Sequence, residues 1–259
     1  MRYILSLLAI STLTFASEIR TMPVTPTPES STVVLAVSMP RKGQVMNNYV
    51  PVKFRIDGYA LGASSPSERA EEIAVSDMGQ TVHVVVDNNP YFPIIGEPID
   101  PFNENGSFWD TTYRFVLPYA LDEGFHLMRF FPARSFGESL KGENTFVAVP
   151  FYIGAATDEW FDLRSPFLTY NEPSNQMYLQ EGKPVLLDFY VTNADLDTDG
   201  YKVRLMIDGQ VNRILHSWQP YYIYGLPQGK HSIRLQLLDP KNQVVSGPYN
   251  DVEQIIFIN

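Results

Sequence analysis

The chain has 259 residues and no cysteine, which excludes disulfide bridges, zinc–thiolate centres and cysteine nucleophiles. Its 29 acidic and 19 basic side chains give a formal charge of −10 at pH 7, so nucleic acid is not an expected partner. Because 44% of the residues are hydrophobic and 13% aromatic, a packed core can hold the fold without covalent bridges.

Residues 1–16 have the pattern of a secretory signal peptide. The basic Arg2 precedes an apolar run over residues 4–15, and small residues surround Ala16, after which cleavage is expected. A membrane span needs roughly 20 apolar residues, so we expect no transmembrane segment in the mature chain. The sequence therefore predicts an exported bacterial protein that is periplasmic, attached to the cell surface or secreted.

Residues 17–31 follow the signal peptide and contain the stretch TMPVTPTPESS. Such a Pro-, Thr- and Ser-rich composition is typical of an extended linker. We predict a flexible leader here, followed by a first domain over residues 32–154.

Two stretches, GFHLMR from Gly124 and GKHSIR from Gly229, share a Gly-x-His-x-x-Arg pattern. They align without a gap as far as Ile153 and Ile258, and upstream VHVVVDN matches VRLMIDG while PVKFRI matches PVLLDF. The chain is therefore predicted to be a tandem duplication, with a linker over residues 155–168 and a second domain over residues 169–259. The first copy has long loop insertions, at residues 62–80 and 90–110.

Within each copy the apolar residues alternate with polar ones. In VRLMID, for example, Val203, Leu205 and Ile207 share one face of an extended chain. Short alternating segments separated by Asp-, Asn-, Gly- and Pro-rich turns predict an all-β fold, with two tandem antiparallel β-sandwich domains. One short helix is expected within residues 65–75, with Ser67 as its N-cap.

The second copy, with VRLMIDGQ, then GLPQGKHSIRLQLLDPKNQVVSGPYNDV and a terminal IIFI, resembles the Ig-like and fibronectin type III-like modules of exported bacterial proteins. The resemblance covers the whole second copy and, interrupted by the loops, most of the first. It implies two Ig-like domains in series. Because such modules serve adhesion, carbohydrate binding, spacing and protein assembly, the resemblance does not imply one function.

The linker contains Trp160, Phe161 and Phe167. Such aromatic residues are unsuited to a solvated tether, so we expect them to pack between the two domains. The alternative is an exposed aromatic binding patch.

His126 and His231 are the histidines of the repeated pattern, and strand parity points both toward the core. In Ig-like sandwiches a tyrosine at the equivalent corner hydrogen-bonds back to the backbone. We predict that each histidine takes this structural corner role. No His-x-His or His-x-x-x-His pair occurs, so a metal site or a catalytic base at these histidines is disfavoured.

Asp195, Asp197 and Asp199 alternate along the chain before Gly200, as in the first half of a calcium-binding loop. The twelfth position of such a loop is Met206 rather than the Glu that an EF-hand needs, so an EF-hand is excluded. A looser calcium site and a plain solvated turn both remain open. No other cofactor is expected.

Aromatic residues supply the ligand-binding candidates. Trp109 and Tyr113 lie in FWDTTYRF of the first copy, and Trp218 and Tyr221 lie in WQPYYIYG of the second. Rings with polar edges suit sugar faces or a protein partner. The alternative is that these rings belong to the sandwich cores.

The sequence contains no Gly-x-Ser-x-Gly, Walker or Rossmann motif. We therefore predict a non-enzymatic binding or structural module of the bacterial envelope, whose loops contact a protein or a glycan. One alternative is a carbohydrate-binding module that uses exposed aromatic residues. The other is a hydrolase with a carboxylate site, which spacing alone cannot reveal.

Overall fold

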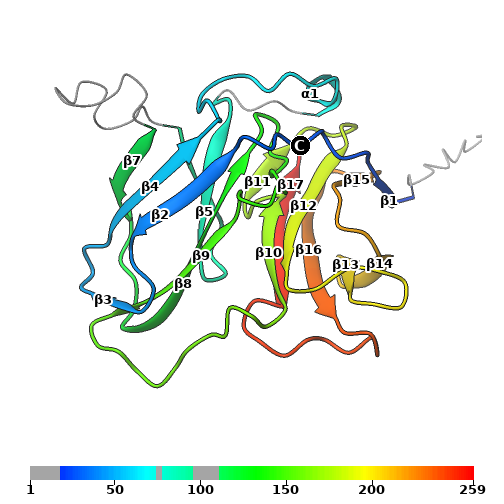
Figure 1. Cartoon of the computed structure of the whole chain (residues 1–259). Helices are drawn as coiled ribbons and strands as arrows, with labels where there is room; N and C mark the ends of the chain where they lie inside the picture. Colours follow the sequence, from blue (N-terminus) through cyan, green and yellow to red (C-terminus); the bar gives the residue numbers. More distant parts are fainter. Residues whose placement is uncertain (1–17, 74–77, 96–110) are drawn as a thin grey trace, which may run out of the picture.

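A computed structural model describes residues 18–73, 78–95 and 111–259 and shows an all-β protein (Figure 1). Its four sheets form two β-sandwiches that lie side by side, here called sandwich 1 and sandwich 2. The predicted signal peptide and Trp109 lie outside the described residues. Within those residues, no helix has the length and apolar character that a membrane span requires.

Sandwich 1 combines a three-stranded sheet, ordered β2-β4-β7, with a five-stranded sheet, ordered β3-β9-β8-β5-β6. Its strands are β2 (Val34–Met39), β3 (Gln44–Met46), β4 (Pro51–Asp57), β5 (Thr81–Val86), β6 (Phe92–Ile94), β7 (Thr112–Val116), β8 (Gly124–Ala133) and β9 (Val147–Ile153). The one helix of the described chain, α1 (Arg69–Glu72), lies in the first long loop, with Glu68 rather than Ser67 at the N-cap position.

Sandwich 2 combines a four-stranded sheet, ordered β1-β15-β12-β10, with a five-stranded sheet, ordered β11-β17-β16-β13-β14. Its strands are β1 (Arg20–Pro23), β10 (Phe167–Glu172), β11 (Met177–Leu179), β12 (Val185–Thr192), β13 (Lys202–Ile207), β14 (Gln210–Leu215), β15 (Tyr221–Tyr224), β16 (Gly229–Leu238) and β17 (Asp251–Ile258).

Apart from β1, the two sandwiches have the same strand order. In each, a short strand (β3 or β11) pairs in parallel with the last strand (β9 or β17), and the remaining pairs are antiparallel. This is the strand order of Ig-like and fibronectin type III-like sandwiches, which confirms the predicted fold class. The duplication is visible in the register, since Gly124 pairs with Ile153 as Gly229 pairs with Ile258.

Each sandwich has its own hydrophobic core between its two sheets. The alternation predicted for Val203, Leu205 and Ile207 is observed, since all three side chains are buried in the core of sandwich 2. Further clusters of buried residues join the two sandwiches, so their division into two domains stays a prediction.

The outer face of β8 forms much of the contact between the sandwiches. Phe131 of β8 packs against Tyr190 of β12, with ring centroids 5.0 Å apart, and Leu127 lies in a cluster with Phe167 and Tyr249. Phe161 of the linker adds to this contact by packing on Phe167 and Tyr249, at 5.3 and 5.0 Å. The interface expected for Phe161 and Phe167 is therefore present.

Trp160 does not take part in that packing, because it is 67% exposed.

The described part of the leader differs from the flexible segment that its composition predicted. Arg20 to Pro23 form β1, which pairs antiparallel with β15 of sandwich 2. Proline is tolerated at the end of an edge strand because no ladder hydrogen bond is needed there. Farther along, Thr27 donates hydrogen bonds to Glu138 from its backbone N–H and its hydroxyl. These tertiary contacts fix a segment whose composition alone favours disorder.

The two corner histidines have the same environment in both copies. The Nε2 atom of His126 lies 2.9 Å from the Asp122 carbonyl oxygen, and that of His231 lies 2.8 Å from the Pro227 carbonyl oxygen. Each Nδ1 atom faces an aspartate carboxylate, Asp87 at 2.8 Å and Asp208 at 2.7 Å. The structure thus places both histidines at the strand corners.

The aspartates of these corners also hold the neighbouring strand. Asp87 accepts a hydrogen bond from the Leu127 N–H and Asp208 one from the Ser232 N–H, each 2.9 Å long. The Asp87 carboxylate raises the pKa of the buried His126. Each corner therefore joins two strands through one buried imidazole and one carboxylate.

Replacing His231 by Phe removes both hydrogen bonds of the corner, to the Pro227 carbonyl oxygen and to the Asp208 carboxylate. We expect the free energy of unfolding to fall by about 1–3 kcal/mol, measured by urea denaturation. His216→Phe is the matched control, since His216 is exposed in the same sandwich, and it should change stability by less than about 0.5 kcal/mol. Equal effects of the two substitutions would contradict the structural role of His231.

Candidate functional site

The structure places two of the four predicted aromatic site residues, Tyr113 and Tyr221, in the cores. Tyr113 is buried and stacks on Phe54, with centroids 5.1 Å apart, and Tyr221 is buried in the core of sandwich 2. Neither ring is available to a ligand. Trp218 is 37% exposed, but its ring packs on Tyr190 and its Nε1 donates to the Phe189 carbonyl oxygen at 2.8 Å. These three residues therefore do not form a joint ligand surface.

The aspartate loop does not gather its carboxylates. The Asp197 carboxylate accepts hydrogen bonds from the backbone and hydroxyl of Thr198, and the Lys202 ammonium donates to the Gly200 carbonyl oxygen at 3.0 Å. Across residues 18–73, 78–95 and 111–259, no three His, Asp or Glu side chains form a group that could hold a metal ion. Calcium binding by Asp195, Asp197 and Asp199 stays a sequence-based prediction.

A pocket lies between the sandwiches, with a volume of about 460 Å³. Strands and loops of both copies line it: β5, the loop before β6 and residues 134–137 of sandwich 1, and the segment from Glu172 to Leu186 of sandwich 2. Most of its wall area is apolar, and the polar side chains that line it include Thr81, His83, Tyr91, Arg134, Ser135 and Glu172. The wall and rim residues include Ile73, Phe136, Pro173, Met177, Tyr178, Gln180, Lys183 and Leu186.

Three titratable side chains meet in this pocket. The ring of Tyr91 stacks on the imidazole of His83, with centroids 3.6 Å apart and planes 8° from parallel. The Tyr91 hydroxyl donates to Glu172 Oε1 at 2.6 Å, and the Ser174 N–H donates to Glu172 Oε2 at 3.1 Å. The pair Tyr91 and Glu172 therefore connects the two sandwiches through a hydrogen bond beside the pocket.

Burial controls the charge of these groups. Desolvation raises the pKa of Glu172 to about 8, against the hydrogen bonds from Tyr91 and Ser174 that favour the carboxylate. Desolvation also lowers the pKa of His83 to about 4 and raises that of Tyr91. At neutral pH all three groups are predominantly uncharged.

The hydrogen bonds of Asn171 define the tautomer of His83. Asn171 Nδ2 donates to the Gly137 carbonyl oxygen at 2.7 Å and to Asp188 at 2.8 Å. The Asn171 oxygen is therefore the atom that faces His83 Nδ1, at 2.7 Å, so Nδ1 carries the proton. His83 Nε2 is left as a hydrogen-bond acceptor.

Gly137 allows the Glu172 side chain to occupy its position. Its φ of +88° is strained for other residues, and a Cβ atom built there would lie 3.0 Å from Glu172 Oε1 and 3.1 Å from Glu172 Cγ. The loop of sandwich 1 therefore packs directly on the Glu172 carboxyl of sandwich 2.

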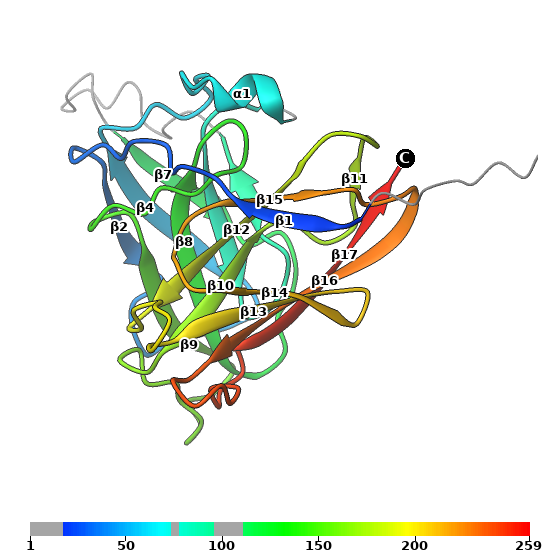
Figure 2. The same cartoon turned by 90° about the vertical axis from the view of Figure 1, so that its right-hand side faces the viewer.

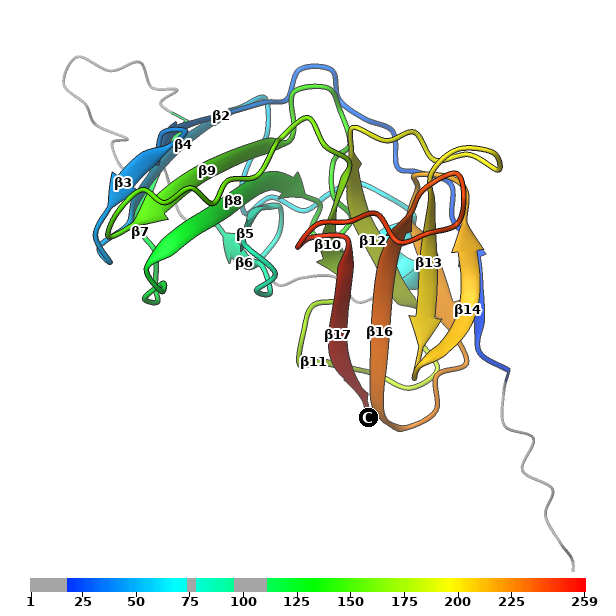
Figure 3. The same ribbon diagram turned by 90° about the horizontal axis from the view of Figure 1, so that it is seen from below.

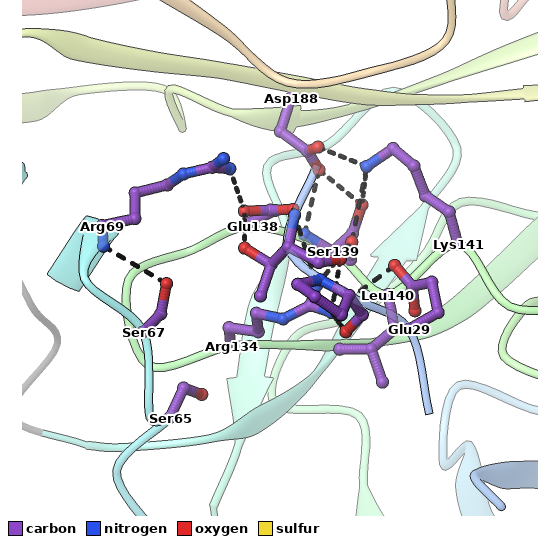
Figure 4. Close-up of polar contacts among 12 residues, drawn as sticks. Glu29, Ser65, Ser67, Arg69, Arg134, Glu138, Ser139, Leu140, Lys141 and Asp188 are labelled. Atoms are coloured by element: carbon purple, nitrogen blue, oxygen red, sulfur yellow. Dashed lines mark hydrogen bonds and ion pairs between the residues drawn. The ribbon is translucent and has the colours of Figure 1, made fainter. Parts of the chain in front are cut away.

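A buried ion pair between Lys141 and Asp188 joins the two sandwiches (Figure 4). The Asp188 carboxylate has no exposed surface, and it accepts hydrogen bonds from Lys141 Nζ at 2.5 Å and from the Ser139 hydroxyl at 2.5 Å. With Asn171, these contacts satisfy a charge that would otherwise be costly to bury.

A second buried ion pair lies beside the first (Figure 4). Arg69 of α1 contacts Glu138, whose carboxylate also lies 3.6 Å from Arg134. Arg69 and Arg134 also donate to backbone carbonyl oxygens of the leader, at Thr25 and Pro28. The helix, the loop over residues 134–138 and the leader are thereby linked at one edge of the interface.

Chemically, the pocket is suited to binding a neutral ligand. Among the described residues that line it, Glu172 is the one carboxylate, whereas glycoside hydrolysis by the common mechanism needs two across the scissile bond. Its protonated carboxyl, the Tyr91 hydroxyl and the neutral His83 can exchange hydrogen bonds with a polar group. The apolar walls can cover the remainder of a small molecule or side chain.

Sequence reasoning missed all three of these polar residues. His83 belongs to a strand that is otherwise almost continuously apolar, and Tyr91 lies in the first-copy insertion over residues 90–110. The sequence feature that could have indicated the site is GFHLMRFF, in which Phe125, Leu127 and Phe131 occupy the strand face that would be solvent-exposed in a half-buried strand. That departure from alternation indicates a strand covered on both faces, hence an interface beside which a pocket can form.

No protein-family model matches the sequence, and no curated protein matches it. Among solved structures, the chain is similar to fibronectin(III)-like modules of Clostridium thermocellum CbhA, with 11% identity over 87% of this chain and 94% of that one, and a TM-score of 0.29. Dimeric latent PorU from Porphyromonas gingivalis aligns with 98% of this chain and 22% of its own, at 16% identity and a TM-score of 0.26.

A third similar structure is the Bacteroides ovatus SGBP-B of a mixed-linkage glucan utilization locus, in complex with a mixed-linkage heptasaccharide. It aligns at 13% identity over 94% of this chain and 48% of its own, with a TM-score of 0.20. At such scores the superposition is poor, so the Ig-like assignment depends on the strand order and register of the chain itself.

The raised pKa of Glu172 predicts a pH dependence of stability. Between the unfolded value of 4.5 and the folded value of about 8, the folded chain holds a proton that the unfolded chain has lost. The free energy of unfolding should therefore fall as pH rises through this window, by at most about 1.4 kcal/mol per pH unit from this group.

Glu172→Gln should remove that part of the slope, measured by urea denaturation at pH values between 5 and 8. Glu143→Gln, at an exposed carboxylate, is the matched control and should retain it. An unchanged slope in the Glu172 variant would show that Glu172 ionises normally in the folded chain.

Proposed function

We propose that this chain is an exported, non-enzymatic binding module of the bacterial envelope, and that its ligand occupies the pocket between the sandwiches. The observation that carries the proposal is the composition of that pocket: apolar walls from both sandwiches around the uncharged group of Tyr91, His83 and Glu172. Pockets of this size and composition commonly bind small molecules or protruding side chains. The signal-peptide pattern of residues 1–16 supports export.

The rigidity of the surroundings supports the same proposal. The pocket is bounded by segments of both sandwiches, and the buried ion pairs of Asp188 and Glu138 lie close to its walls. A site held open by packed elements binds without an ordering cost. We therefore propose a neutral, largely apolar ligand with one hydrogen-bonding group directed toward Glu172 and Tyr91.

Carbohydrate binding is the second candidate, and one observation favours it. Tyr178 at the pocket rim is 67% exposed and stacks on Phe257, with centroids 4.9 Å apart and planes 15° from parallel. An exposed ring held in a fixed orientation can pack on a sugar face.

The neutral fluorophore N-phenyl-1-naphthylamine tests the pocket directly. We expect saturable binding of one molecule per chain, with enhanced fluorescence. Leu186→Trp places a larger side chain in the pocket wall and should weaken binding at least about 10-fold. Trp218→Phe, at a partly exposed ring outside the pocket lining, should leave the affinity unchanged.

Far-UV circular dichroism should show that both variants are folded. Probe binding that is insensitive to Leu186→Trp would contradict the assignment of the pocket. Retention on polysaccharide that Tyr178→Ala abolishes, in the absence of probe binding, would instead support the carbohydrate candidate.

A further inference from the structure

The N-terminal segment over residues 19–24 contributes a strand to the sandwich that is formed by the C-terminal part of the chain. Figure 2 shows β1 beside β15, and Figure 3 shows the same segment running along the side of sandwich 2 near β14. Four residue pairs join β1 to β15, from Arg20 with Tyr224 to Pro23 with Tyr221. The segment therefore extends a sheet whose other strands are more than 140 residues away in sequence.

The segment also contacts the second sheet of sandwich 2. The Thr21 hydroxyl donates to Asn212 Oδ1 at 2.6 Å, Asn212 Nδ2 donates to the Ile19 carbonyl oxygen at 3.3 Å, and Arg213 donates to the Thr21 carbonyl oxygen at 2.5 Å. Asn212 and Arg213 belong to β14, an edge strand of the five-stranded sheet. Residues 19–24 thus lie between the edges of the two sheets and close this side of the sandwich.

Side chains as well as backbone fit this site. Thr21 is only 5% exposed, and Ile19 packs against the core of sandwich 2, whereas the Arg20 and Met22 side chains are exposed. The site therefore accepts an extended peptide with an apolar residue, a spacer and a threonine. Backbone pairing supplies affinity and the alternate side chains supply selectivity, as in other cases of strand addition.

Sandwich 1 closes the equivalent side differently. Phe92 of β6 and Phe115 of β7 bring their rings to 5.5 Å at right angles, and both pack against the core. The duplicated fold thus does not by itself require an added strand at this side. The strand site is a particular feature of sandwich 2.

Up to residue 24 the N-terminal segment hydrogen-bonds to sandwich 2, and after residue 24 it hydrogen-bonds to sandwich 1. The Val24 N–H donates to the Pro220 carbonyl oxygen of sandwich 2, whereas Thr25 and Thr27 contact Arg69 and Glu138 of sandwich 1. Residues 19–24 are therefore an arm that is tethered to one sandwich and bound by the other. Tethering gives such an arm an effective concentration of about a millimolar or more.

We propose that the groove between β14 and β15 is a strand-acceptor site for extended peptides of this pattern, and that residues 19–24 are its intramolecular ligand. A peptide from another molecule can then bind when the arm is released, or when its concentration exceeds the effective concentration of the arm. This site lies outside the lining of the inter-sandwich pocket and does not depend on the function proposed for that pocket.

The test uses the full chain with a protease cleavage sequence inserted between Ser30 and Ser31, both exposed, and cut after folding. The probe is a fluorescent peptide of residues 18–26, and fluorescence anisotropy measures its binding. We expect saturable binding to the cleaved chain and roughly 100-fold weaker binding to the intact chain, whose arm fills the groove. Retention of the released fragment through gel filtration, followed by its displacement by the probe, would equally support the site.

Peptide variants test the specificity of the groove. Ile19→Asp in the peptide should weaken binding at least about 10-fold, because it places a charge against the core. Met22→Gln, at an exposed position, should leave binding unchanged. Dimers of the intact chain that dissociate on addition of peptide would identify a second copy as one source of the strand.

Three results would overturn the proposal: no saturable binding by a cleaved chain that keeps its far-UV circular dichroism, equal binding by cleaved and intact chains, or equal binding of the wild-type and Ile19→Asp peptides. A chain that loses its arm and unfolds would be examined by adding the peptide during refolding. Failure of the peptide to restore the fold would also count against the site.

Discussion

The burial of Asp188 constrains the arrangement of the whole molecule. Its carboxylate has no exposed surface, and an unpaired charge there would cost several kcal/mol. Its partners Ser139 and Lys141 come from sandwich 1, whereas Asp188 itself belongs to β12 of sandwich 2. The charge is therefore satisfied only when the two sandwiches adopt one relative position. The alignment of Gly137 with Glu172, and with it the shape of the pocket, follows from that position.

The apolar part of the interface explains why the two copies have diverged. The outer face of β8 carries Phe125, Leu127 and Phe131, while the matching positions of β16 are Lys230, Ser232 and Gln236. Sandwich 1 uses this face to bind its neighbour, whereas sandwich 2 carries polar side chains there, and Arg234 and Gln236 both donate hydrogen bonds to Asp251. A duplicated fold has thus produced two sandwiches joined by a packed interface, with a pocket between them and a strand bound from the N-terminal arm.

The sequence predicted the fold class well because apolar and polar residues alternate regularly along the strands of the second copy. The duplication and the corner positions of His126 and His231 depend on local patterns and on one repeated motif. Tyr221 was predicted as a ligand-binding candidate, with the sandwich core as the alternative, and the structure buries both Tyr221 and its neighbour Tyr222. Sandwich 1 and α1 cover the outer face of β15, so alternation could not identify the inner face.

The candidate site could not be predicted in the same way, because it combines residues of both sandwiches. His83 and Glu172, for example, lie 89 positions apart in the sequence and come together only when the sandwiches pack. The sequence did not predict the pairing of the leader with β15 for a related reason, since that pairing is a tertiary contact that composition does not encode.

Differential scanning calorimetry of wild type and Asp188→Ala tests the central claim that the buried Asp188 contact makes the two sandwiches unfold as one cooperative unit. We expect a single transition with equal calorimetric and van't Hoff enthalpies, shifted as a whole in the variant. Two separate transitions in the wild-type chain would contradict it.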